Sequence, residues 1–474
     1  MKLYNTLKKQ IEDIRPLNPP VVTVYTCGPT VYDYPHIGNW FTFIRYDVLV
    51  RTLKLSGLEP NWVMNITDVG HLVSDADDGE DKLEKGAKRE GKTAWNVATF
   101  YSNYFTEGLR RLNFTWPNAL PKATDHIAEQ IDMIKTLDEK GFTYVIDDGV
   151  YYDTAKFPKY ADFAQLDLDE QQAGARVEVN PQKRNATDFA LWKFSPKDQQ
   201  RDMEWDSPWG KGFPGWHIEC SAMSRKYLGD TLDIHSGGID HIPVHHTNEI
   251  AQSEAATGKA FANHWMHTNH IFINDEKISK SLNNMIILED IETKGYSLEA
   301  FRLHVLESHY RSQSKFSWES LGAAQNRLKS YQAVADLRWQ TIPQTTTPAE
   351  DDAYIELITE TLPIQISEAL LNDLDTPTVL SVLSMAEAEL IRGYHTGNLS
   401  IFSDFVARFI DGVLGLKLLK SHDITEAQKT LMSQREQARK AQGWQKSDEL
   451  RDQLKEQGIG LNDVPDGSTI WFRL

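Results

Sequence analysis

Two short apolar runs flank a segment with helical periodicity near the N-terminus. Residues 21–26 form a run rich in β-branched side chains, and residues 61–67 form a second run. The segment between them, from 38 to about 56, repeats its apolar residues at helical spacing and stops at Gly57. The stripe that would face a sheet consists of Phe41, Ile44 and Val48. A strand, a helix and a strand in this order predict a βαβ unit of a parallel sheet.

The pattern loses this regularity in the middle of the chain and regains it afterwards. Residues 115–200 mix one helical segment, 125–140, with short strand-like pieces between 144 and 153. This mixture predicts an insertion that interrupts the sheet. A strand-like run at 231–235 and a helix starting near His245 then resume the α/β pattern. Because ligands of open α/β sheets bind beyond the carboxyl ends of the strands, we expect the functional residues of both halves to converge there.

The last third of the chain is helical. Residues 341–348, with the sequence TIPQTTTP, form the clearest linker. A helical bundle is predicted from there to about residue 419. A segment rich in Arg, Lys and Gln, residues 433–451, then precedes a short tail. These shifts in composition predict a bundle and a separate small C-terminal module.

The chain contains only two cysteines in 474 residues, and both lie in contexts that suit a metal ligand. Cys27 ends the first apolar strand before a Gly-Pro turn, and Cys220 closes the sequence GWHIEC. His245 and Glu249 are four residues apart, so on a helix they share one face at chelating distance. Two thiolates, an imidazole and a carboxylate can complete a tetrahedral zinc shell. Two buried free thiols and a solvated His/Glu helix face explain these residues equally well.

Two further motifs indicate nucleotide binding. Residues 35–39 (PHIGN) open the first helix, where His36, Gly38 and free N–H groups could face a phosphate. Residues 277–281 (KISKS) follow a later apolar strand, and two lysines on a loop can neutralise a leaving pyrophosphate. A capped helix start and a solvated turn are the plain alternatives. The two motifs in this order are typical of the ATP signatures of a class I aminoacyl-tRNA synthetase.

The full set of motifs resembles the cysteinyl-tRNA synthetase family over nearly the whole chain. The segments that carry the resemblance are 25–33 (YTCGPTVYD), 65–68 (NITD), 173–177 (AGARV), 215–223 (GWHIECSAM), 245–249 (HHTNE) and 277–281. The resemblance implies an α/β class I synthetase with a Rossmann-type catalytic domain, an inserted connective subdomain, a C-terminal helical bundle and a small anticodon-binding module. The implied catalytic parts are the first Rossmann half at residues 1–114, the connective insertion at 115–200 and the second Rossmann half with the zinc ligands at 201–270. They are followed by the KISKS loop and stem-contact region at 271–340, the helical bundle at 341–420 and the anticodon-binding module at 421–474.

The resemblance also assigns the site residues. One zinc ion per chain would be bound by Cys27, Cys220, His245 and Glu249. L-Cysteine would be bound by Gly28, Thr67, Trp216 and Asp240, with Asp240 near the amino group and Trp216 beside the side chain. ATP, accompanied by Mg²⁺, would be bound by His36, Gly38, Asn39, Gly238, Lys277 and Lys280, and the residues with catalytic roles would be His36, Lys277 and Lys280. Asn39 departs from the most familiar motif, which has a second histidine there, and an amide cannot carry charge.

The implied reaction has two steps. Cysteine attacks the α-phosphate of ATP to give cysteinyl-adenylate and pyrophosphate, and the terminal ribose hydroxyl of the cysteine tRNA then takes the acyl group. Zinc would select the substrate thiol, because a hydroxyl is a poorer ligand and an apolar pocket rejects serine only weakly. The predicted tRNA contacts in the C-terminal module are Arg435, Arg439 and Trp471.

Two other functions fit part of the pattern. A tRNA-independent ligase that joins cysteine to an amino sugar would resemble the catalytic half, but the C-terminal module argues against it. A non-catalytic tRNA-binding paralogue would resemble the whole chain, but the intact KISKS motif and the complete set of ligands argue against that function.

Composition is consistent with these expectations. The chain is 40% hydrophobic and 25% charged, as in ordinary globular proteins. It has no apolar run of membrane-spanning length, and its N-terminus lacks the apolar core of a secretory signal. We therefore expect a cytoplasmic monomer with no membrane partner. Cysteines so far apart in a reducing compartment are poor disulfide candidates, which again favours a metal.

The formal net charge of −18 is unexpected for a protein that binds RNA, but it is unevenly distributed. Residues 301–340 contain six Lys/Arg and three acids, which leaves this window at +3. Residues 429–451 likewise contain six Lys/Arg and three acids. Either window alone is equally well explained by solvated helix faces with i,i+4 ion pairs. The two together predict local basic surfaces on an acidic protein.

Overall fold

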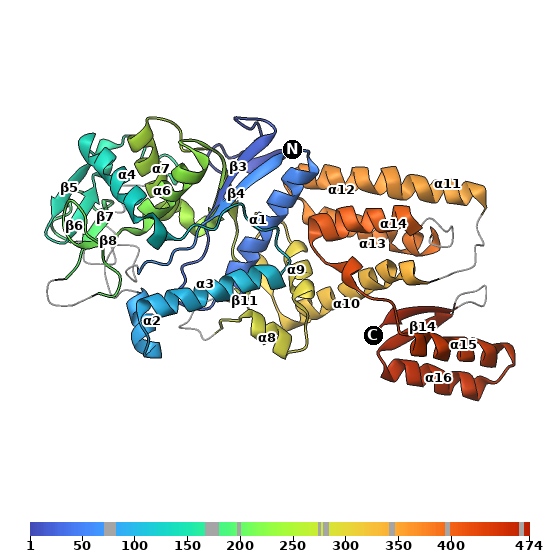
Figure 1. Ribbon diagram of the computed structural model, residues 1–474. Helices are drawn as coiled ribbons and strands as arrows, with labels where there is room; N and C mark the ends of the chain where they lie inside the picture. The colour runs from blue at the N-terminus through green and yellow to red at the C-terminus, as the bar shows by residue number, and fades with distance from the viewer. Residues whose placement is uncertain are drawn as a thin grey trace. The chain divides into compact units, whose positions relative to one another are not determined.

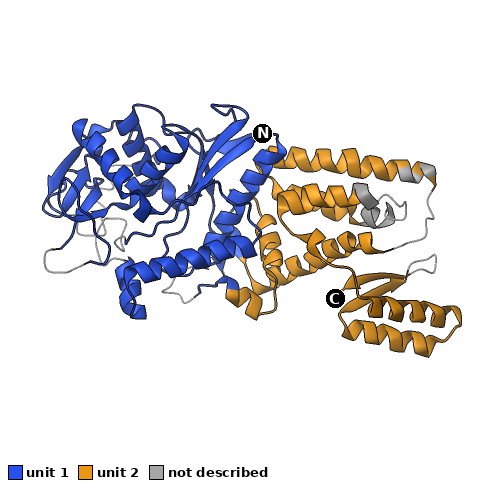
Figure 2. Ribbon diagram, in the orientation of Figure 1, with its two compact units in different colours: residues 1–288, 310–315 blue, residues 289–309, 316–474 orange. Residues whose placement is uncertain are grey.

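The structure of the protein is a computed structural model. It describes residues 1–70, 82–165, 180–196, 201–273, 276–277, 284–340, 347–393, 399–463 and 469–474. The chain divides into two compact units (Figure 2). Unit 1 comprises residues 1–288 and 310–315, and unit 2 comprises residues 289–309 and 316–474.

A four-stranded parallel sheet lies at the centre of unit 1 (Figure 1). Its strands, in spatial order, are β10 (Ala262–Thr268), β9 (Leu232–Gly238), β3 (Val21–Thr26) and β4 (Glu59–Met64). From the central β3–β9 pair, the chain proceeds to β4 on one side and to β10 on the other. This pair is therefore the topological switch point, beyond whose carboxyl ends ligands of open α/β sheets bind.

The predicted βαβ unit is present. Helix α1 (Ile37–Leu55) connects β3 to β4, and its predicted stripe of Phe41, Ile44 and Val48 is buried. Strand β4 ends at Met64, earlier than the sequence predicted. The chain leaves the sheet at Asn65, and Ile66 and Thr67 instead form isolated bridges with Lys122 and Thr30.

The segment predicted as an insertion, residues 115–200, forms a small α/β layer whose sheet extends beyond residue 200. Helix α4 (Ile127–Glu139) packs near an antiparallel sheet with the order β5–β6–β7–β8. These strands are Thr143–Ile146, Gly149–Tyr152, Phe189–Phe194 and Gly212–Pro214. The insertion shares one hydrophobic core with the parallel sheet, and the core includes Tyr25, Met133, Trp192, Met223 and Trp265.

The other elements of unit 1 cover or extend this framework. Helices α6 (Trp216–Leu228) and α7 (Thr247–Thr257) flank β9 in the chain. A π-helical turn, Ile242–His246, precedes α7, so the regular helix begins two residues after His245. The remaining helices and strands are β1 (Lys2–Asn5), β2 (Gln10–Asp13), α2 (Lys82–Glu90), α3 (Ala94–Arg111), β11 (Ile271–Ile273), β12 (Glu276–Lys277) and β13 (Ser314–Phe316), of which the last crosses the unit boundary.

Unit 2 is helical and ends in a small mixed module. Its helices include α8 (Leu288–Thr293), which begins at the unit boundary, α9 (Leu298–Leu306), α10 (Trp318–Asp336), α11 (Pro348–Glu356), α12 (Leu362–Leu371), α13 (Thr376–Gly393) and α14 (Leu399–Phe405). The module consists of α15 (Glu426–Lys440), α16 (Trp444–Glu456) and the antiparallel hairpin β14–β15 (Ile459–Asp463 and Thr469–Arg473). Among the described residues, no helix combines the length and apolar composition that a membrane span requires.

Candidate functional site

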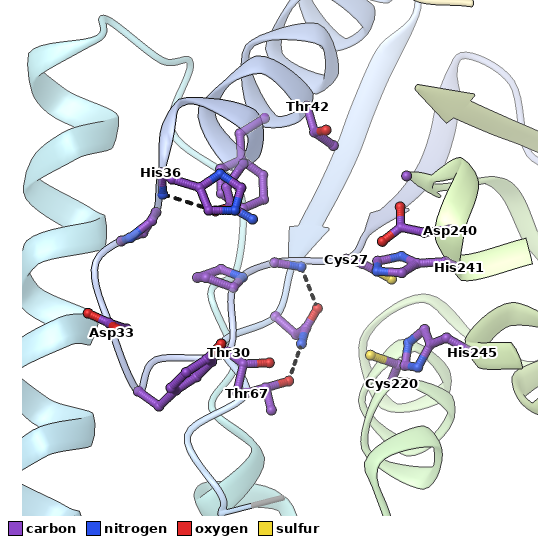
Figure 3. Close-up of a pocket in the computed structure, with 18 of the residues that line it drawn as sticks. Cys27, Thr30, Asp33, His36, Thr42, Thr67, Cys220, Asp240, His241 and His245 are labelled. Atoms are coloured by element: carbon purple, nitrogen blue, oxygen red, sulfur yellow. Dashed lines mark hydrogen bonds between the residues drawn. The ribbon is translucent and has the colours of Figure 1, made fainter. Parts of the chain in front are cut away.

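A cavity of about 400 Å³ opens at the switch point of the parallel sheet (Figure 3). The ends of β3 and β4, the first turn of α1, the first turns of α6 and the segment after β9 line it. Figure 3 shows Cys220, His241 and His245 on one side of the cavity and Asp33 and His36 on the other. The lining residues that the sequence predicted are Cys27, Gly28, His36, Asn39, Thr67, Trp216, Cys220, Gly238, Asp240 and His245.

Four possible metal ligands meet at the wall of this cavity. The donor atoms of Cys27, Cys220, His245 and Glu249 all lie within 4.8 Å of one another, and all four residues are buried. A second possible set shares Cys27 and Glu249 but uses His235 and His246. Both sets offer soft sulfur and imidazole donors together with a carboxylate, which suits zinc better than magnesium or calcium.

Hydrogen bonding distinguishes the two sets. His235 Nε2 lies 3.0 Å from Glu249 Oε2, and His246 Nδ1 lies 2.7 Å from His267 Nε2, so both histidines have partners within the protein. Glu249 Oε1, which both sets share, is buried, has no hydrogen-bond partner among the described residues and lies 3.7 Å from His245 Nε2. His245 Nδ1 lies 3.0 Å from His217 Nδ1, which leaves Nε2 on the side of Glu249. These partners favour the set with Cys220 and His245 as ligands and His235 as a supporting residue.

Protonation states follow from burial at this cluster. Burial, with the nearby Cys220 and Glu249, raises the pKa of the Cys27 thiol well above its usual range. Burial lowers the pKa of His245 well below its usual range, so the imidazole is neutral and can act as a ligand. Burial also acts to raise the pKa of Glu249, but His235 and His245 outweigh it, and the pKa lies below its usual value. A cation bound between these groups would stabilise the thiolate forms.

The first turn of α1 has a specific cap. His36 is the N-cap residue, and its Nδ1 accepts a hydrogen bond from Gly38 N–H (3.1 Å). Asn39 Oδ1 accepts from His36 N–H (3.0 Å), which completes a capping box. The amide at position 39 therefore orders the helix terminus that faces the cavity. This gives Asn39 a structural role besides the predicted contact with the nucleotide.

Several predicted residues are only partly covered by the structure. Lys277 ends strand β12, and its backbone alone is described. Lys280, with the rest of residues 278–283, and the AGARV segment at 173–177 lie outside the described residues. Met285, which follows the KISKS motif, lines the cavity. Gly38 lies in the first turn of α1, next to lining residues.

The cavity also contains residues that the sequence did not single out. Asn65 and His241 line it, and Glu219 lies directly behind Thr67. Asn65 and Glu219 are members of the quoted NITD and GWHIECSAM segments, but no periodicity or spacing distinguished them from their neighbours. Their contribution depends on side-chain contacts across three separate segments, which the sequence pattern does not reveal.

Comparison with known proteins identifies the family. Residues 13–326 match the model of the class I (C) tRNA synthetase catalytic domain, and residues 421–470 match that of the cysteinyl-tRNA ligase anticodon binding domain. The chain is 41% identical to the cysteine–tRNA ligase of Treponema denticola, over 100% of both chains. It is 42% identical to cysteine–tRNA ligase 1 of Burkholderia lata, over 99% of this chain and 97% of that one. The chain belongs to the cysteine–tRNA ligase family.

Solved structures support the fold of this ligase. Methionyl-tRNA synthetase of Mycobacterium tuberculosis, in complex with methionyl-adenylate, superimposes with a TM-score of 0.59 at 14% identity. The match covers 84% of this chain and 92% of that one. The predicted class I α/β fold is thereby confirmed.

The anticodon-binding module of the ligase changes the interpretation of two predicted residues. Arg435 is 1% exposed, and its guanidinium forms two hydrogen bonds of 2.7 Å with Asp463. Trp471 is 3% exposed and belongs to the small core of the module. Their burial assigns both side chains to the packing of the module instead of an RNA-facing surface. Arg439 keeps an exposed edge, and Trp444 is a 60% exposed aromatic residue that the prediction did not include among the contacts.

Proposed function

We propose that this ligase activates L-cysteine with ATP and transfers the cysteinyl group to the 3′ end of cysteine tRNA. The observation that carries the proposal is one cavity lined by a cluster of possible zinc ligands and by the capped N-terminus of α1. A site for a thiol and a site for a nucleotide would then share the same space. This arrangement suits a reaction in which the amino acid attacks the α-phosphate.

We infer that one zinc ion is held by Cys27, Cys220, His245 and Glu249. The donor set and Glu249 Oε1, which has no hydrogen-bond partner in the described part of the chain, fit this metal. When bound, zinc would supply a ligand position for the substrate sulfur, and it would discriminate against a hydroxyl by its preference for thiolate. His235 would orient Glu249 through the 3.0 Å contact with Oε2.

The remaining lining residues would position the two substrates. Trp216 stands beside His245, with 4.5 Å between the ring centroids, so it would pack against the cysteine side chain. Asp240 reaches the same cavity and would face the substrate ammonium group. His36, Gly38, Asn39 and Gly238 would hold ATP, which arrives with Mg²⁺, and Lys277 and Lys280 would neutralise charge on the pyrophosphate as it leaves.

Contact with tRNA would involve the exposed face of the C-terminal module. Arg439 offers a partly exposed guanidinium for phosphate, and Trp444 offers an exposed ring for stacking on an unpaired base. The match of residues 421–470 to an anticodon binding domain leaves the amino-sugar ligase without support. A monomer remains our prediction for the oligomeric state.

Amino-acid-dependent ATP–pyrophosphate exchange, measured with each of the twenty amino acids, tests the proposal together with elemental analysis. We expect exchange with cysteine alone and about one zinc per chain. Charging of cysteine tRNA should require the complete chain. Exchange with a different amino acid, or full activity in a zinc-free preparation, would overturn the assignment.

A further inference from the structure

Three side chains, of which Figure 3 labels Thr67, form a hydrogen-bond relay at the wall of the cavity. Thr67 Oγ1 donates to Glu219 Oε2 at 3.1 Å. Asn65 Nδ2 donates to Thr67 Oγ1 at 3.0 Å, and Asn65 Oδ1 accepts from Gly28 N–H at 2.8 Å. The relay joins the start of α6, the segment after β4 and the segment after β3, which are distant in the sequence.

The relay has a fixed direction. A carboxylate only accepts hydrogen bonds, so the single O–H of Thr67 donates its hydrogen bond to Glu219. The hydroxyl oxygen must then accept from the amide nitrogen of Asn65, which turns the amide oxygen toward Gly28 N–H. One lone pair of Thr67 Oγ1 is left over. Because the single O–H of Thr67 is already engaged with Glu219, this oxygen can meet only a donor in the substrate.

The backbone around the relay is equally constrained. Thr67 N–H donates to Pro29 O, and Val31 N–H donates to Thr67 O, both at 3.0 Å. A Cβ atom on Gly28 would lie 1.8 Å from Asn65 O, so no other residue fits at this close approach. Cys27, the adjacent residue, is bound through its own N–H to Ser236 O at 3.0 Å. A small displacement of the relay would therefore also move Gly28 and Cys27, which line the cavity.

Burial makes the relay hard to replace. Asn65, Thr67 and Glu219 are all buried. Removal of one member therefore takes away a hydrogen bond of its buried neighbour, and the loss of a buried hydrogen bond is costly. The side chains are thus held in one arrangement instead of exchanging among several.

We propose that Asn65 and Glu219 are positioning residues for cysteine binding. Glu219 accepts the hydrogen bond of the Thr67 hydroxyl and so presents Thr67 Oγ1 as an acceptor for the ammonium group of the substrate. Asn65 holds Gly28 and Thr67 at a fixed separation. The inference rests on the proposed function, and it extends the cysteine site by two residues and by the identity of the substrate group that Thr67 meets.

Steady-state exchange kinetics test this role. Thr67→Val removes the acceptor and should raise the KM for cysteine about tenfold, while the KM for ATP stays unchanged. Thr67→Ser keeps the hydroxyl but loses the methyl group, so its KM for cysteine should rise less than that of Thr67→Val. Glu219→Gln keeps the shape but loses the charge, and it should raise the KM for cysteine about fivefold. Thr124→Val is a matched control, because it also removes a hydroxyl bonded to a carboxylate, that of Asp68 (2.7 Å), in the same unit.

Two truncated substrates identify the group that Thr67 meets. Cysteamine keeps the thiol and the ammonium group, whereas 3-mercaptopropionate keeps the thiol and the carboxylate. The inhibition constant of cysteamine should rise in Thr67→Val and Glu219→Gln in parallel with the KM for cysteine. That of 3-mercaptopropionate should stay within about twofold of wild type, because it lacks the group in question. Equal losses for both inhibitors would overturn the assignment.

A double-mutant cycle separates positioning from a merely structural role. If Glu219 acts through Thr67, Glu219→Gln should have no further effect on the KM for cysteine in the Thr67→Val background. Additive effects would refute the relay. Zinc content and unfolding midpoints of every variant show whether the fold and the ligands are intact, and Asn65→Ala provides a second route if Glu219→Gln does not fold. Failure of the wild type to activate cysteine would instead contradict the proposed function, so the two outcomes are distinguishable.

Discussion

The cavity of unit 1 and the C-terminal module of unit 2 both gather polar side chains around a carboxylate, but only the module satisfies its carboxylate completely. Asp463 accepts hydrogen bonds from Thr469 and from three arginines, which are Arg435, Arg439 and Arg451. Glu249 keeps one buried oxygen without a hydrogen-bond partner in the described part of the chain. Because buried polar groups are almost always paired, an unpaired oxygen within a cluster of possible metal ligands indicates a bound ligand, whereas a fully paired carboxylate indicates a structural role.

Electrostatics support the same distinction. The hydrogen bond from Arg435 lowers the pKa of Asp463 to about 2, so the charge of this carboxylate is fully matched by cations of the protein. Around Glu249 the neighbours are histidines, and burial lowers the pKa of His245 and His246 well below the usual range. His235 and His245 hold the pKa of Glu249 below its usual value, but one carboxylate oxygen has no hydrogen-bond partner among the described residues. A bound cation would complete this cluster.

Removal of a ligand from the incomplete cluster should have the largest effect. Cys220→Ser replaces a soft ligand by a hard one, so we expect loss of zinc and a fall in cysteine-dependent exchange of at least about a hundredfold. Elemental analysis and exchange rates measure both. His264→Asn alters another buried histidine of unit 1, which pairs with Glu12 (3.4 Å), and it should keep zinc and activity. A Cys220→Ser variant that retains zinc would remove this residue from the site.

Removal of the module should act on the tRNA step alone. Truncation after residue 420 leaves all four possible zinc ligands and both nucleotide motifs in place, so exchange with cysteine should be nearly unchanged. Charging of tRNA should fall by about two orders of magnitude, because the tRNA loses its second point of attachment. Parallel exchange and charging assays measure this. Undiminished charging would contradict the assignment of the module.

Within the module, Arg435 should matter for stability and not for cysteine activation. Arg435→Met leaves Asp463 with its more exposed partners, and we expect a loss of about 2 kcal/mol in the stability of the module. Hydrogen exchange of the β14 and β15 amides reports this locally. Arg451→Met, at a half-exposed partner of the same carboxylate, is the control and should cost less. Loss of cysteine-dependent exchange in Arg435→Met would contradict the comparison.

The smallest effect should be a pH dependence of the module. The pKa of Asp463 is lowered from 3.8 to about 2 by folding, so its contribution is present above pH 4 and is lost as the pH falls toward 2. At about pH 3 the module should have lost about 1 kcal/mol from this group. Hydrogen exchange of the hairpin as a function of pH measures it. Arg435→Met removes the main cause of the shift and should flatten the profile; an unchanged slope would show that another group titrates.

Local patterns were sufficient to predict the elements around the site. The run at 21–26, the helix that follows it and the burial of Phe41, Ile44 and Val48 depend on periodicity within one segment. The convergence of Cys27, Cys220 and His245 on the ends of the parallel strands also followed, because the order of strands and helices restricts the possible topologies.

The hydrogen-bond partners of individual residues were not predictable in the same way. Arg435 and Trp471 were expected to face RNA, but the guanidinium of Arg435 is held by Asp463. The backbone N–H of Trp471 donates to the side chain of Gln340 (2.9 Å), and its C=O accepts from the same side chain (3.0 Å). Asn39 was regarded only as a substitute for histidine, but it completes the cap of α1. In each case a side chain has a partner that composition does not specify.

The sequence by itself determined which chemical groups this protein possesses and at which ends of its strands they lie, because residue type and periodicity are local properties. Only the tertiary structure decided which of those groups remain available. Among the described residues, Glu249 Oε1 accepts no hydrogen bond, whereas both oxygens of Asp463 do, although both groups are carboxylates of an acidic chain. The physical reason is that a hydrogen bond or an ion pair satisfies a group only when folding brings a partner within about 3 Å. Distances this short between residues far apart in the chain are a property of the packed fold.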